Sequence, residues 1–542
     1  MPAKTDEKLN SFARDAAMAA VSGLAIEPTS LVSYASSGVV AVIGDEQACK
    51  AASMMSAVLK PHLILSDNSN PAGNTCIRIC QRDVHVEGYL GNFVITLQGG
   101  DDDVDIVKAD LVLDLSDTAL LAMPLKPPGY IASASTESDM QLAIDELAQM
   151  TGTFEKPKYF EYDSSICAHG RSGITACRRC IDVCPADAIK SLRESIEVDP
   201  NLCQGGGACA SACPSGAIRY VYPSADDTLS LIRRLLNVYR EEGGQDAIVV
   251  FHAAETEIPD SYAGNILPIV IEELASVGIE IWLSALAYGA RTVLLLDDDR
   301  VPDQVRRELK RQLLTSTEIL AGMGYSADAI SLIDSKKFIP ACHPEMPEIR
   351  PATFAGSGNK RQSAFMAIDA LYEQASTVVE KQPPVMATLT PGAAFGEAII
   401  NDSSCTLCMS CVSACPGNAL QNGQDVPQVL FIESLCLQCG MCTCTCPEGA
   451  ISISPRILFD REQRNHSRSL YEEPPFCCVS CGKPFATKSV IDNMMKKLSG
   501  HWMFTDERAK QRLMMCEDCR VVDVIQDPEM MERDLHRGRI TH

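Results

Sequence analysis

The sequence predicts a multidomain protein that mixes the α/β and α+β classes, on three observations. First, the chain has 542 residues, which is more than one hydrophobic core usually organises. Second, residues 33–150 and 223–340 alternate short apolar runs with helical patterns, as Rossmann-like and flavodoxin-like α/β domains do. Third, most of the 25 cysteines fall into short-spaced groups in three further segments.

These segments predict an order of domains along the chain. The linker helix is expected at SAFMAIDALYEQA, from Ser363. We expect a helical lead-in at 1–32, the Rossmann-like domain at 33–150, a first cysteine-rich module at 155–222, the flavodoxin-like domain at 223–340, a linker with a helix at 341–395, a second cysteine-rich module at 396–456 and a four-cysteine tail at 470–525.

The composition is that of an ordinary globular protein, with 46% hydrophobic and 22% charged residues. Clustered cysteines favour metal ligation in a reducing compartment over a disulfide framework. The first twenty residues lack the apolar core of a signal peptide, and no apolar run approaches the length of a membrane span, so we expect a cytoplasmic protein. The net charge of −24 argues against binding to nucleic acid, whose phosphates would repel it.

The second cysteine-rich module contains one pattern twice, C-x2-C-x2-C-x3-C-P. This pattern is typical of proteins that hold two 4Fe-4S clusters, in which the fourth ligand of each cluster comes from the other repeat. Zinc knuckles are the alternative, but they use pairs of C-x2-C and no third cysteine in phase. The predicted ligand sets are Cys405, Cys408, Cys411 with Cys446, and Cys436, Cys439, Cys442 with Cys415.

The first cysteine-rich module is an imperfect copy of this pattern. Alignment on its two Cys-Pro pairs leaves Ile174 and Gly206 where two ligands are expected. Cys167 is the preferred replacement for the first; His169 is a weaker one, since a solvated turn histidine is more common. We expect one 4Fe-4S cluster on Cys167, Cys177, Cys180 and Cys213, and a 3Fe-4S or atypical 4Fe-4S cluster on Cys203, Cys209 and Cys184. The alternative for the second set is a decayed site without metal.

Residues 33–150 read as a doubly wound sheet. Strands are expected at VVAVIG after Gly38, HLILS from His62, FVITLQ from Phe93 and LVLDL from Leu111, with a helix after the first strand. The turn at 43–46 lacks G-x-G-x-x-G, and its two acidic residues would repel a phosphate. A dinucleotide site is therefore not expected.

Residues 223–340 read as a small flavodoxin-like sheet. Strands are expected at AIVVF, ILPIVI, VLLL and ISLI, and helices at LSLIRRLLNVYREEG, IWLSALAYGA and 302–322. No phosphate-binding loop follows AIVVF, so no cofactor is placed here. Asp297, Asp298 and Asp299 could bind a cation, although a solvated strand end is the more common explanation.

The tail carries two C-x2-C pairs, the ligand set of a closed tetrahedral zinc site. A helix, SVIDNMMKKL, must fit between the pairs. Because so small a segment has little core, the metal should supply most of its folding energy. A rubredoxin-like iron site or a fifth cluster is the alternative. The predicted ligands are Cys478, Cys481, Cys516 and Cys519.

From Cys167 to Cys519, the chain resembles bacterial multi-cluster 4Fe-4S ferredoxin-like proteins that are encoded with formate dehydrogenase. The likeness lies in CRRCIDVCPADAI, CASACPSGAI, SALAYGA, GNKR, CTLCMSCVSACPGNAL, CLQCGMC, CVSCGKPF, HWMF and CEDCR. It implies an electron-transfer protein with a redox partner such as formate dehydrogenase. Residues 247–335 also look like the small sheet of hydrogenase and heterodisulfide reductase delta-type subunits, without their cysteine set.

The predicted function is one-electron transfer through iron-sulfur clusters, without a catalytic site or substrate chemistry of its own. Two alternatives stay open. One is a flavin-dependent electron-splitting oxidoreductase that uses residues 247–335. The other is a non-redox assembly factor for a molybdenum or tungsten dehydrogenase.

Overall fold

The computed structural model describes residues 7–23, 30–66, 76–78, 83–99, 104–132, 136–171, 173–259, 261–338, 345–378, 383–424, 426–498, 500–501, 504 and 506–527. They form two compact units. The first unit comprises residues 1–167 and 178–383, and the second comprises 168–177 and 384–542. The first cysteine-rich module therefore lies in the first unit, apart from residues 168–177.

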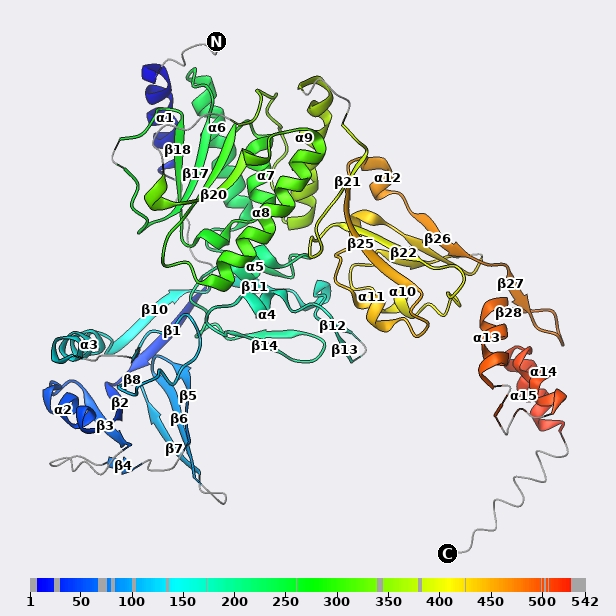
Figure 1. Ribbon diagram of the computed structural model, residues 1–542, viewed down its shortest axis with the longest axis horizontal. Coiled ribbons are helices and arrows are strands. Elements are labelled where there is room, and N and C mark those ends of the chain that lie inside the picture. Colours follow the sequence, from blue (N-terminus) through cyan, green and yellow to red (C-terminus); the bar gives the residue numbers. More distant parts are fainter. Residues whose placement is uncertain are drawn as a thin grey trace, which may run out of the picture. The chain divides into compact units, whose positions relative to one another are not determined.

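A four-stranded parallel sheet, in the order β18-β17-β19-β20, forms the α/β domain at 223–340 (Figure 1). Nearly every residue of β17 and β19 is buried, as expected where both faces of a parallel sheet are covered. Each strand and helix predicted for this segment is present. They are α6 (Ala225–Glu241), β17 (Ile248–Ala253), β18 (Ile266–Ile271), α7 (Ile279–Ala287), β19 (Thr292–Asp297), α8 (Asp303–Met323) and β20 (Ile330–Asp334), and the linker helix α9 (Lys360–Val378) packs on α7.

The helix expected as a lead-in, α1 (Glu7–Val21), packs along α6 of this domain (Figure 1). Asn10 exchanges two hydrogen bonds with the backbone of Gln245, and the Glu7 carboxylate accepts one from the N–H of Gly264. Ala13 and Ala17 are buried in the contact. The N-terminal helix is thus an integral part of the domain at 223–340.

A second parallel sheet, in the order β4-β3-β2-β8-β9, forms the domain at 33–150. Val40 and Val42 face the helices, whereas Ala41 and Ile43 face the opposite side. The elements are β2 (Val39–Gly44), α2 (Glu46–Met54), β3 (Lys60–Leu65), β4 (Cys76–Arg78), β8 (Leu111–Asp114), β9 (Tyr130–Ala132) and α3 (Glu137–Gln149).

The opposite face is covered by an antiparallel sheet of three strands in the order β5-β6-β7, not by the helices of a doubly wound fold. Phe93, Ile95 and Leu97 alternate with more exposed residues, the period-two pattern of a sheet with one buried face. The doubly wound prediction is therefore wrong for this face. The strands are β5 (Asp83–Tyr89), β6 (Asn92–Gln98) and β7 (Val104–Ala109).

The part of the first cysteine-rich module that lies in the first unit contains two short antiparallel pairs and two one-turn helices among its described residues. Phe160, Ile189, Ile196 and Ile218 form its core together with the cysteines. A further antiparallel pair, β1 (Leu31–Ser36) with β10 (Gly152–Pro157), precedes it. The module's elements are β11 (Phe160–Tyr162), α4 (Arg179–Val183), β14 (Ile189–Ser191), β15 (Ile196–Val198), α5 (Ala208–Ala212) and β16 (Ile218–Tyr220), with β11 paired to β16 and β14 to β15.

The second cysteine-rich module, in the second unit, repeats this plan with larger sheets. Strand β21 extends one sheet and β26 extends the other, so the sheets use residues on both sides of the segment predicted at 396–456. The elements are β21 (Met386–Thr388), β22 (Gly396–Ile400), α10 (Ser410–Ala414), β23 (Leu420–Asn422), β24 (Gln428–Phe431), α11 (Met441–Thr445), β25 (Ile451–Leu458), α12 (Arg461–Asn465) and β26 (Arg468–Glu472).

The tail forms a hairpin followed by three helices. The helix expected between its two cysteine pairs is present. The elements are β27 (Pro475–Cys477), β28 (Pro484–Thr487), α13 (Lys488–Leu498), α14 (Glu507–Leu513) and α15 (Glu517–Ile525).

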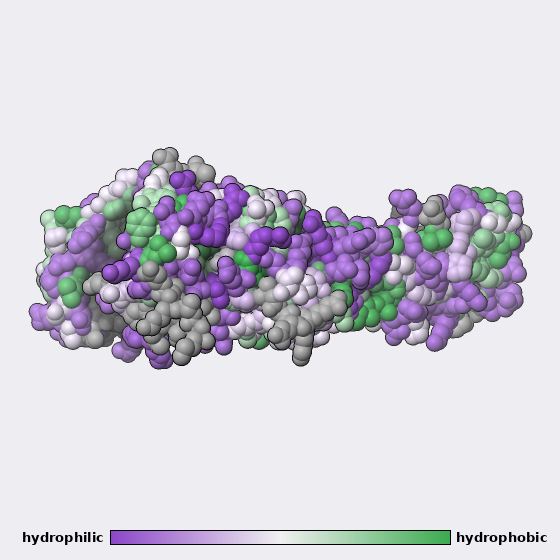
Figure 2. Space-filling model, turned by 90° about the horizontal axis from the view of Figure 1, so that it is seen from above, coloured by the Kyte–Doolittle hydropathy of each residue, from purple (hydrophilic) through white to green (hydrophobic). Residues whose placement is uncertain are grey.

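Hydrophilic and hydrophobic residues are interspersed over the face of the molecule shown in Figure 2. Scattered apolar residues of this kind are normal on protein surfaces. Within the described ranges, no helix is both long and apolar enough to cross a membrane.

Candidate iron-sulfur and metal sites

The thiols of the second module gather in two groups, and each group draws on both repeats. Burial raises the pKa of Cys411 to about 12, and the neighbouring thiols of Cys405, Cys408 and Cys446 add to the rise. The pKa of Cys405 is raised by burial and by Cys408 and Cys446 in the same way. The last cysteine of the second repeat therefore lies with the first three of the first repeat.

The other group of thiols combines the first three cysteines of the second repeat with the last cysteine of the first repeat. Burial raises the pKa of Cys442, and Cys439, Cys436 and Cys415 raise it further, followed by a smaller contribution from Cys411. These four cysteines line one cavity, together with apolar side chains that include Leu420. The donors match a 4Fe-4S cluster in kind and number, because such a cluster needs four thiolates.

Each C-x2-C-x2-C loop of the second module contains two residues in the left-handed conformation. They are Leu407 (φ +53°) and Met409 (φ +59°) in the first loop and Gln438 (φ +52°) and Gly440 (φ +78°) in the second. This backbone directs N–H groups to the thiols: the N–H of Leu407 donates to Cys405, and the N–H of Met441 donates to Cys439. Such N–H groups stabilise negative charge at the cysteine sulfurs.

All four Cys-Pro pairs of the chain enter the same turn. The second residue after each proline is left-handed, and it is glycine, asparagine or aspartate, which tolerate this conformation best. A shared turn at four positions shows that both modules retain the same local fold. These residues are Asp187 (φ +47°), Gly216 (φ +72°), Asn418 (φ +52°) and Gly449 (φ +59°).

A buried ionic network holds the start of the second loop. Glu433, which is 3% exposed and lies three residues before Cys436, accepts hydrogen bonds from Arg456 (3.0 and 2.7 Å) and Arg468 (2.8 Å). Both arginines also pair with Glu397, at 2.7 and 3.2 Å. Burial alone would raise the pKa of Glu433, but the two arginines outweigh it and the pKa is lowered.

In the first module, Cys184, Cys203 and Cys209 lie together. Burial raises the pKa of Cys209 well above its ordinary value, and Cys203 and Cys184 raise it further, followed by a smaller contribution from Cys180. Backbone N–H groups donate to these thiols here too, from Gly205 to Cys203 and from Ala188 to Cys184. Three thiolates with such support fit a cluster that lacks one cysteine ligand.

The loop between Cys203 and Cys209 keeps the cluster-binding backbone although one cysteine is missing. Gly205 (φ +80°) and Gly207 (φ +66°) are left-handed, like their counterparts Gln438 and Gly440. A Cβ atom added at Gly206 would meet no heavy atom within 4 Å, so the place of the absent cysteine is open space.

The structure places Cys167, not Ile174, at the position of Cys405. In both modules a polar residue, Asp163 or Asn401, lies four positions before this cysteine. Its side-chain oxygen accepts two hydrogen bonds from the serine two positions further along, one from the serine N–H and one from the serine hydroxyl. Its own N–H donates to an alanine carbonyl, at 2.7 Å in the first module and 2.8 Å in the second. By these hydrogen bonds Cys167, the residue preferred from the sequence, lies at the position that corresponds to Cys405.

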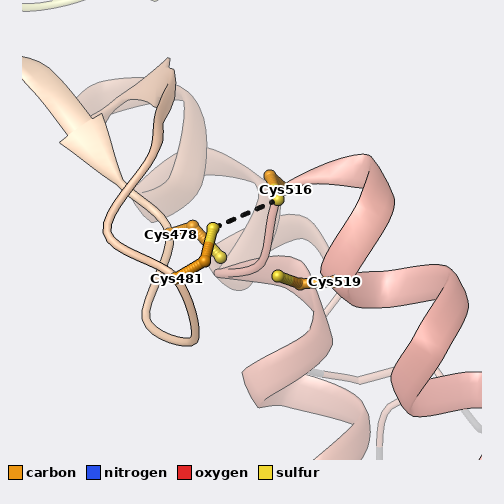
Figure 3. Close-up of side chains that lie close together, drawn as sticks. All are labelled: Cys478, Cys481, Cys516 and Cys519. Carbon is orange, nitrogen blue, oxygen red and sulfur yellow. Dashed lines mark hydrogen bonds between the residues drawn. The ribbon is translucent and has the colours of Figure 1, made fainter.

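The four cysteines of the tail converge, with all four sulfurs within 4.8 Å of one another (Figure 3). Cys516 is the residue just before α15, and Cys478 begins a tight turn that is closed by a hydrogen bond from the N–H of Gly482 to its carbonyl. Desolvation acts to raise the pKa of Cys478, but N–H groups that include those of Cys516 and Ser480 outweigh it and lower the pKa to about 6. Four converging thiols with a stabilised thiolate form a metal site.

Comparison with known proteins agrees with these cysteine sets. The family described as "4Fe-4S binding domain" matches residues 196–219 and 398–421, which contain the loops of Cys203 and Cys405. A protein named "Ferredoxin" from Alicyclobacillus acidocaldarius subsp. acidocaldarius is 33% identical over 61 residues, which are 11% of this chain and 78% of that protein. The chain belongs to the ferredoxin family.

A second ferredoxin relative, "Ferredoxin 7Fe" from Hydrogenibacillus schlegelii, is 41% identical over 39 residues. These residues are 7% of this chain, and the chain spans half the length of that relative. The ferredoxin likeness thus covers only a small part of the chain.

An inserted hairpin separates the first two ligand positions of the first ferredoxin module. Nine residues lie between Cys167 and Cys177, against two between Cys405 and Cys408. The insertion forms β12 (Gly170–Arg171) and β13 (Ile174–Thr175), which belong to the second unit. There Arg171 donates to the carbonyl of Cys415 at 3.3 Å, β13 packs against α11, and Cys177 lies near Cys439, whose pKa it raises.

The remaining residues that the sequence singled out lie outside the proposed ligand sets. His169, expected as a solvated turn histidine, is 1% exposed, and its Nδ1 lies 2.7 Å from the carbonyl oxygen of Cys177. Each aspartate of the 297–299 run pairs with a cation of the chain, Asp297 with Arg306, Asp298 with Arg300 and Asp299 with Lys336. Cys444 and Cys477 are exposed and join no ligand group among the described residues. Residues 502 and 503 of HWMF lie outside the described residues.

Three charged residues around the ferredoxin loops were not predicted from the sequence. They are Glu433, described above, and Lys156 and Lys360, whose ammonium groups donate to backbone carbonyls of the first module. Lys360 lies within the GNKR segment that carries the family resemblance. The spacing of charged residues in the sequence does not single out Glu433 or Lys156, because their partners lie far away along the chain.

Proposed function

We propose that this chain carries single electrons through four iron-sulfur clusters and delivers them to, or receives them from, a redox enzyme. The observation that carries the proposal is the crossed grouping of thiols in the second module, Cys446 with the first repeat and Cys415 with the second. Crossed ligation is the arrangement of two-cluster ferredoxins. The ferredoxin relatives support the same function.

When bound, each cluster would supply a one-electron redox couple. The chain's own residues would bind each cluster, stabilise its charge and shield it from water. Cysteine thiolates hold the metal, left-handed loop residues direct N–H groups to the sulfurs, and the apolar core around Phe431 and Ile451 keeps water away. The proposed 4Fe-4S ligands are Cys405, Cys408, Cys411 and Cys446; Cys436, Cys439, Cys442 and Cys415; and Cys167, Cys177, Cys180 and Cys213.

The fourth cluster, on Cys184, Cys203 and Cys209, would be of the 3Fe-4S type. The open space at Gly206, where the other module has Cys439, supports this assignment. One relative bears the name "Ferredoxin 7Fe", and seven irons correspond to one 4Fe-4S and one 3Fe-4S cluster. Loss of one anionic thiolate is expected to raise the reduction potential of this cluster.

Anaerobic reconstitution of the full chain tests the proposal. We expect about fifteen irons per chain, from three 4Fe-4S clusters and one 3Fe-4S cluster, together with the EPR signal of an oxidised 3Fe-4S centre. Fewer than about eight irons would mean that the second module does not hold two 4Fe-4S clusters, and the proposal would fail.

We propose a formate dehydrogenase as the redox partner, because the family resemblance implies it. The net charge of −24 suits docking on a basic patch, and such steering weakens with added salt. Purified dehydrogenase should reduce the reconstituted chain in the presence of formate, at a rate that falls as ionic strength rises. Reduction by other dehydrogenases but not by this one would exclude the assignment.

We propose that the tail binds zinc through Cys478, Cys481, Cys516 and Cys519. Structural zinc contributes about 10 to 16 kcal/mol to the folding of small domains, more than a tail of this size can gain from its own core. Chelation should therefore make residues 475–525 sensitive to protease while the rest of the chain stays resistant. One zinc per chain by elemental analysis is expected; iron in its place would overturn the assignment.

A further inference from the structure

Two lysine ammonium groups lie on either side of the loop that runs from Cys203 to Cys209. Lys156 donates to carbonyl oxygens at the beginning of this loop, and Lys360 donates to carbonyl oxygens just after it. Neither lysine contacts a cysteine sulfur in these bonds. Both lie in the first unit, as the loop does.

Lys156 reaches the loop from β10. Its Nζ donates to the carbonyl of Asn201 at 2.9 Å and to the carbonyl of Cys203. The ammonium group lies 5.0 Å from the centre of the Tyr34 ring, and the Tyr34 hydroxyl donates to the same Asn201 carbonyl at 2.7 Å. The positive charge is thus held against the backbone of a cluster ligand.

Lys360 is the first residue of α9. Its Nζ donates to the carbonyls of Ala210 (2.8 Å) and Ser211, in the short helix α5 between Cys209 and Cys213. The side chain is only 14% exposed. A cation at the carboxyl end of a helix is favourable, because the last carbonyls carry partial negative charge.

One carboxylate accompanies Lys360. Oε2 of Glu280 lies 3.8 Å from the ammonium nitrogen, and the side chain of Glu280 is 7% exposed. This oxygen accepts no hydrogen bond. Both side chains line a cavity of about 180 Å³ that also meets the first turn of α6. The charged groups around the loop therefore include the cations Lys156 and Lys360 and the anion Glu280. Asp199 also acts on Lys156 and on the Cys203 thiol, and Asp187 acts on the Cys184 thiol.

The corresponding loop of the second module is flanked by a different set of charged groups. There, Arg456 and Arg468 face Glu433 and Glu397, so the two positive charges meet two negative ones. The first module has Pro200 at the position that corresponds to Glu433, counted back from Cys203 and Cys436. The two loops share a backbone but differ in the charge placed beside it.

We propose that Lys156 and Lys360 raise the reduction potential of the cluster held by Cys184, Cys203 and Cys209, and that Glu280 partly offsets Lys360. This inference rests on the proposed function. Reduction adds one negative charge, which the two ammonium groups stabilise, and Coulomb interactions of buried groups are weakly screened. Both lysines are positioning residues for electron transfer, since they act through the loop and touch no metal.

The test is an EPR-monitored redox titration of the reconstituted full chain at a series of pH values from neutral to mildly alkaline, because burial lowers the pKa of Lys156 while it raises that of Glu280. The pKa of Glu280 is raised by burial, against the effect of Lys360, and an alkaline buffer keeps its carboxyl ionised. Lys156→Met and Lys360→Met should each lower the midpoint potential, so that the ratio of reduced to oxidised cluster at a fixed potential falls about fivefold or more. Glu280→Gln should raise it.

Matched variants separate charge from packing. Lys360→Arg keeps the charge and should retain the wild-type potential. Lys336→Met removes the same charge from an exposed site, 72% exposed, and should change nothing. A lysine variant that fails to fold leaves the other lysine and Glu280→Gln to decide the question.

The outcomes are distinct. Opposite shifts for the lysine variants and Glu280→Gln support the proposal, because a purely structural role would not reverse sign. Unchanged potentials in the lysine variants, or equal shifts in Lys336→Met, overturn it. A wild-type chain without a signal from this cluster would overturn the proposed function itself, and this inference with it.

Discussion

The two ferredoxin modules share a backbone but not a ligand set. In both modules, left-handed residues flank the position three residues after the first cysteine of the loop. They are Gly205 and Gly207 in one module and Gln438 and Gly440 in the other. Yet that position is Gly206 in the first module and Cys439 in the second. The loop conformation therefore depends on the flanking residues and the core beneath them, and the missing thiolate changes the chemistry without changing the fold.

The modules also differ in how their first ligand is joined to the second. Asp163 and Asn401 make the same hydrogen bonds, so Cys167 and Cys405 begin the same turn. A hairpin then follows in one module and a tight loop in the other. The position of the first ligand is thus set by the strand and turn before it, and the chain beyond it is free to lengthen.

The largest expected effect comes from removing a crossed ligand. Cys446→Ser should cost one cluster, about four irons per chain. The double variant Cys405→Ser, Cys446→Ser decides the pairing. If both ligate one cluster, the double variant also loses about four irons; ligands of two different clusters would lose about eight. Cys444→Ser changes an exposed cysteine in α11, two residues before Cys446; it is the control and should lose none.

The next effect concerns the ionic network of the second module alone. Glu433→Gln should destabilise this module by about 3 to 5 kcal/mol, because two partly buried arginines lose a buried charged partner. The exposed pair of Glu161 and Arg219 in the first module provides the control, since Glu161→Gln should cost no more than about 1 kcal/mol. Thermal unfolding of both variants measures the difference, and equal effects would contradict it.

The pH dependence of this network has a definite sign. The pKa of Glu433 is lowered in the folded chain from its ordinary value of 4.5. Its contribution to stability is therefore present above pH 4.5 and is lost as the pH falls through the lower folded pKa. Glu433→Gln should lack this loss on acidification. A variant that keeps the wild-type acid profile would show that other groups cause it.

A smaller effect is expected from the glycines of the first module. Gly207→Ala places a Cβ atom 2.5 Å from Cα of Ser276 at a left-handed position, so we expect a loss of roughly 2 kcal/mol or more. Gly206→Ala is the matched control, because its Cβ would meet nothing within 4 Å. Thermal unfolding and iron content should change for Gly207→Ala only. Equal losses would mean that the open space at residue 206 is needed.

The smallest change is a gain of one iron. Gly206→Cys should supply the missing thiolate and convert the 3Fe-4S signal of the first module into that of a 4Fe-4S cluster. Cys439→Gly is the reciprocal change, and it should produce a 3Fe-4S signal in the second module. EPR of the oxidised proteins distinguishes the two cluster types. An unchanged spectrum of Gly206→Cys would show that the thiolate cannot reach the cluster.

Much of the architecture could be predicted from the sequence because the relevant signals are local. Buried parallel strands are short continuous apolar runs, and each predicted strand from Ile248 to Asp334 is present. The spacing of cysteines in the second module and in the tail likewise selects its chemistry within a few residues. The second face of the sheet at 33–150 was mispredicted, because an isolated strand such as Phe93–Leu97 does not reveal whether its neighbours are parallel.

The cysteine pattern by itself determined what kind of group this chain binds, since thiolates at these spacings suit few other ligands. Only the tertiary structure decided which residue takes each place. For Cys167, already preferred from the sequence, the structure adds a turn that matches the turn before Cys405, a likeness of hydrogen bonds that no spacing reveals. Lys156, Lys360 and Glu433 reach the loops from distant parts of the chain, and their effect depends on burial, which only the folded structure establishes.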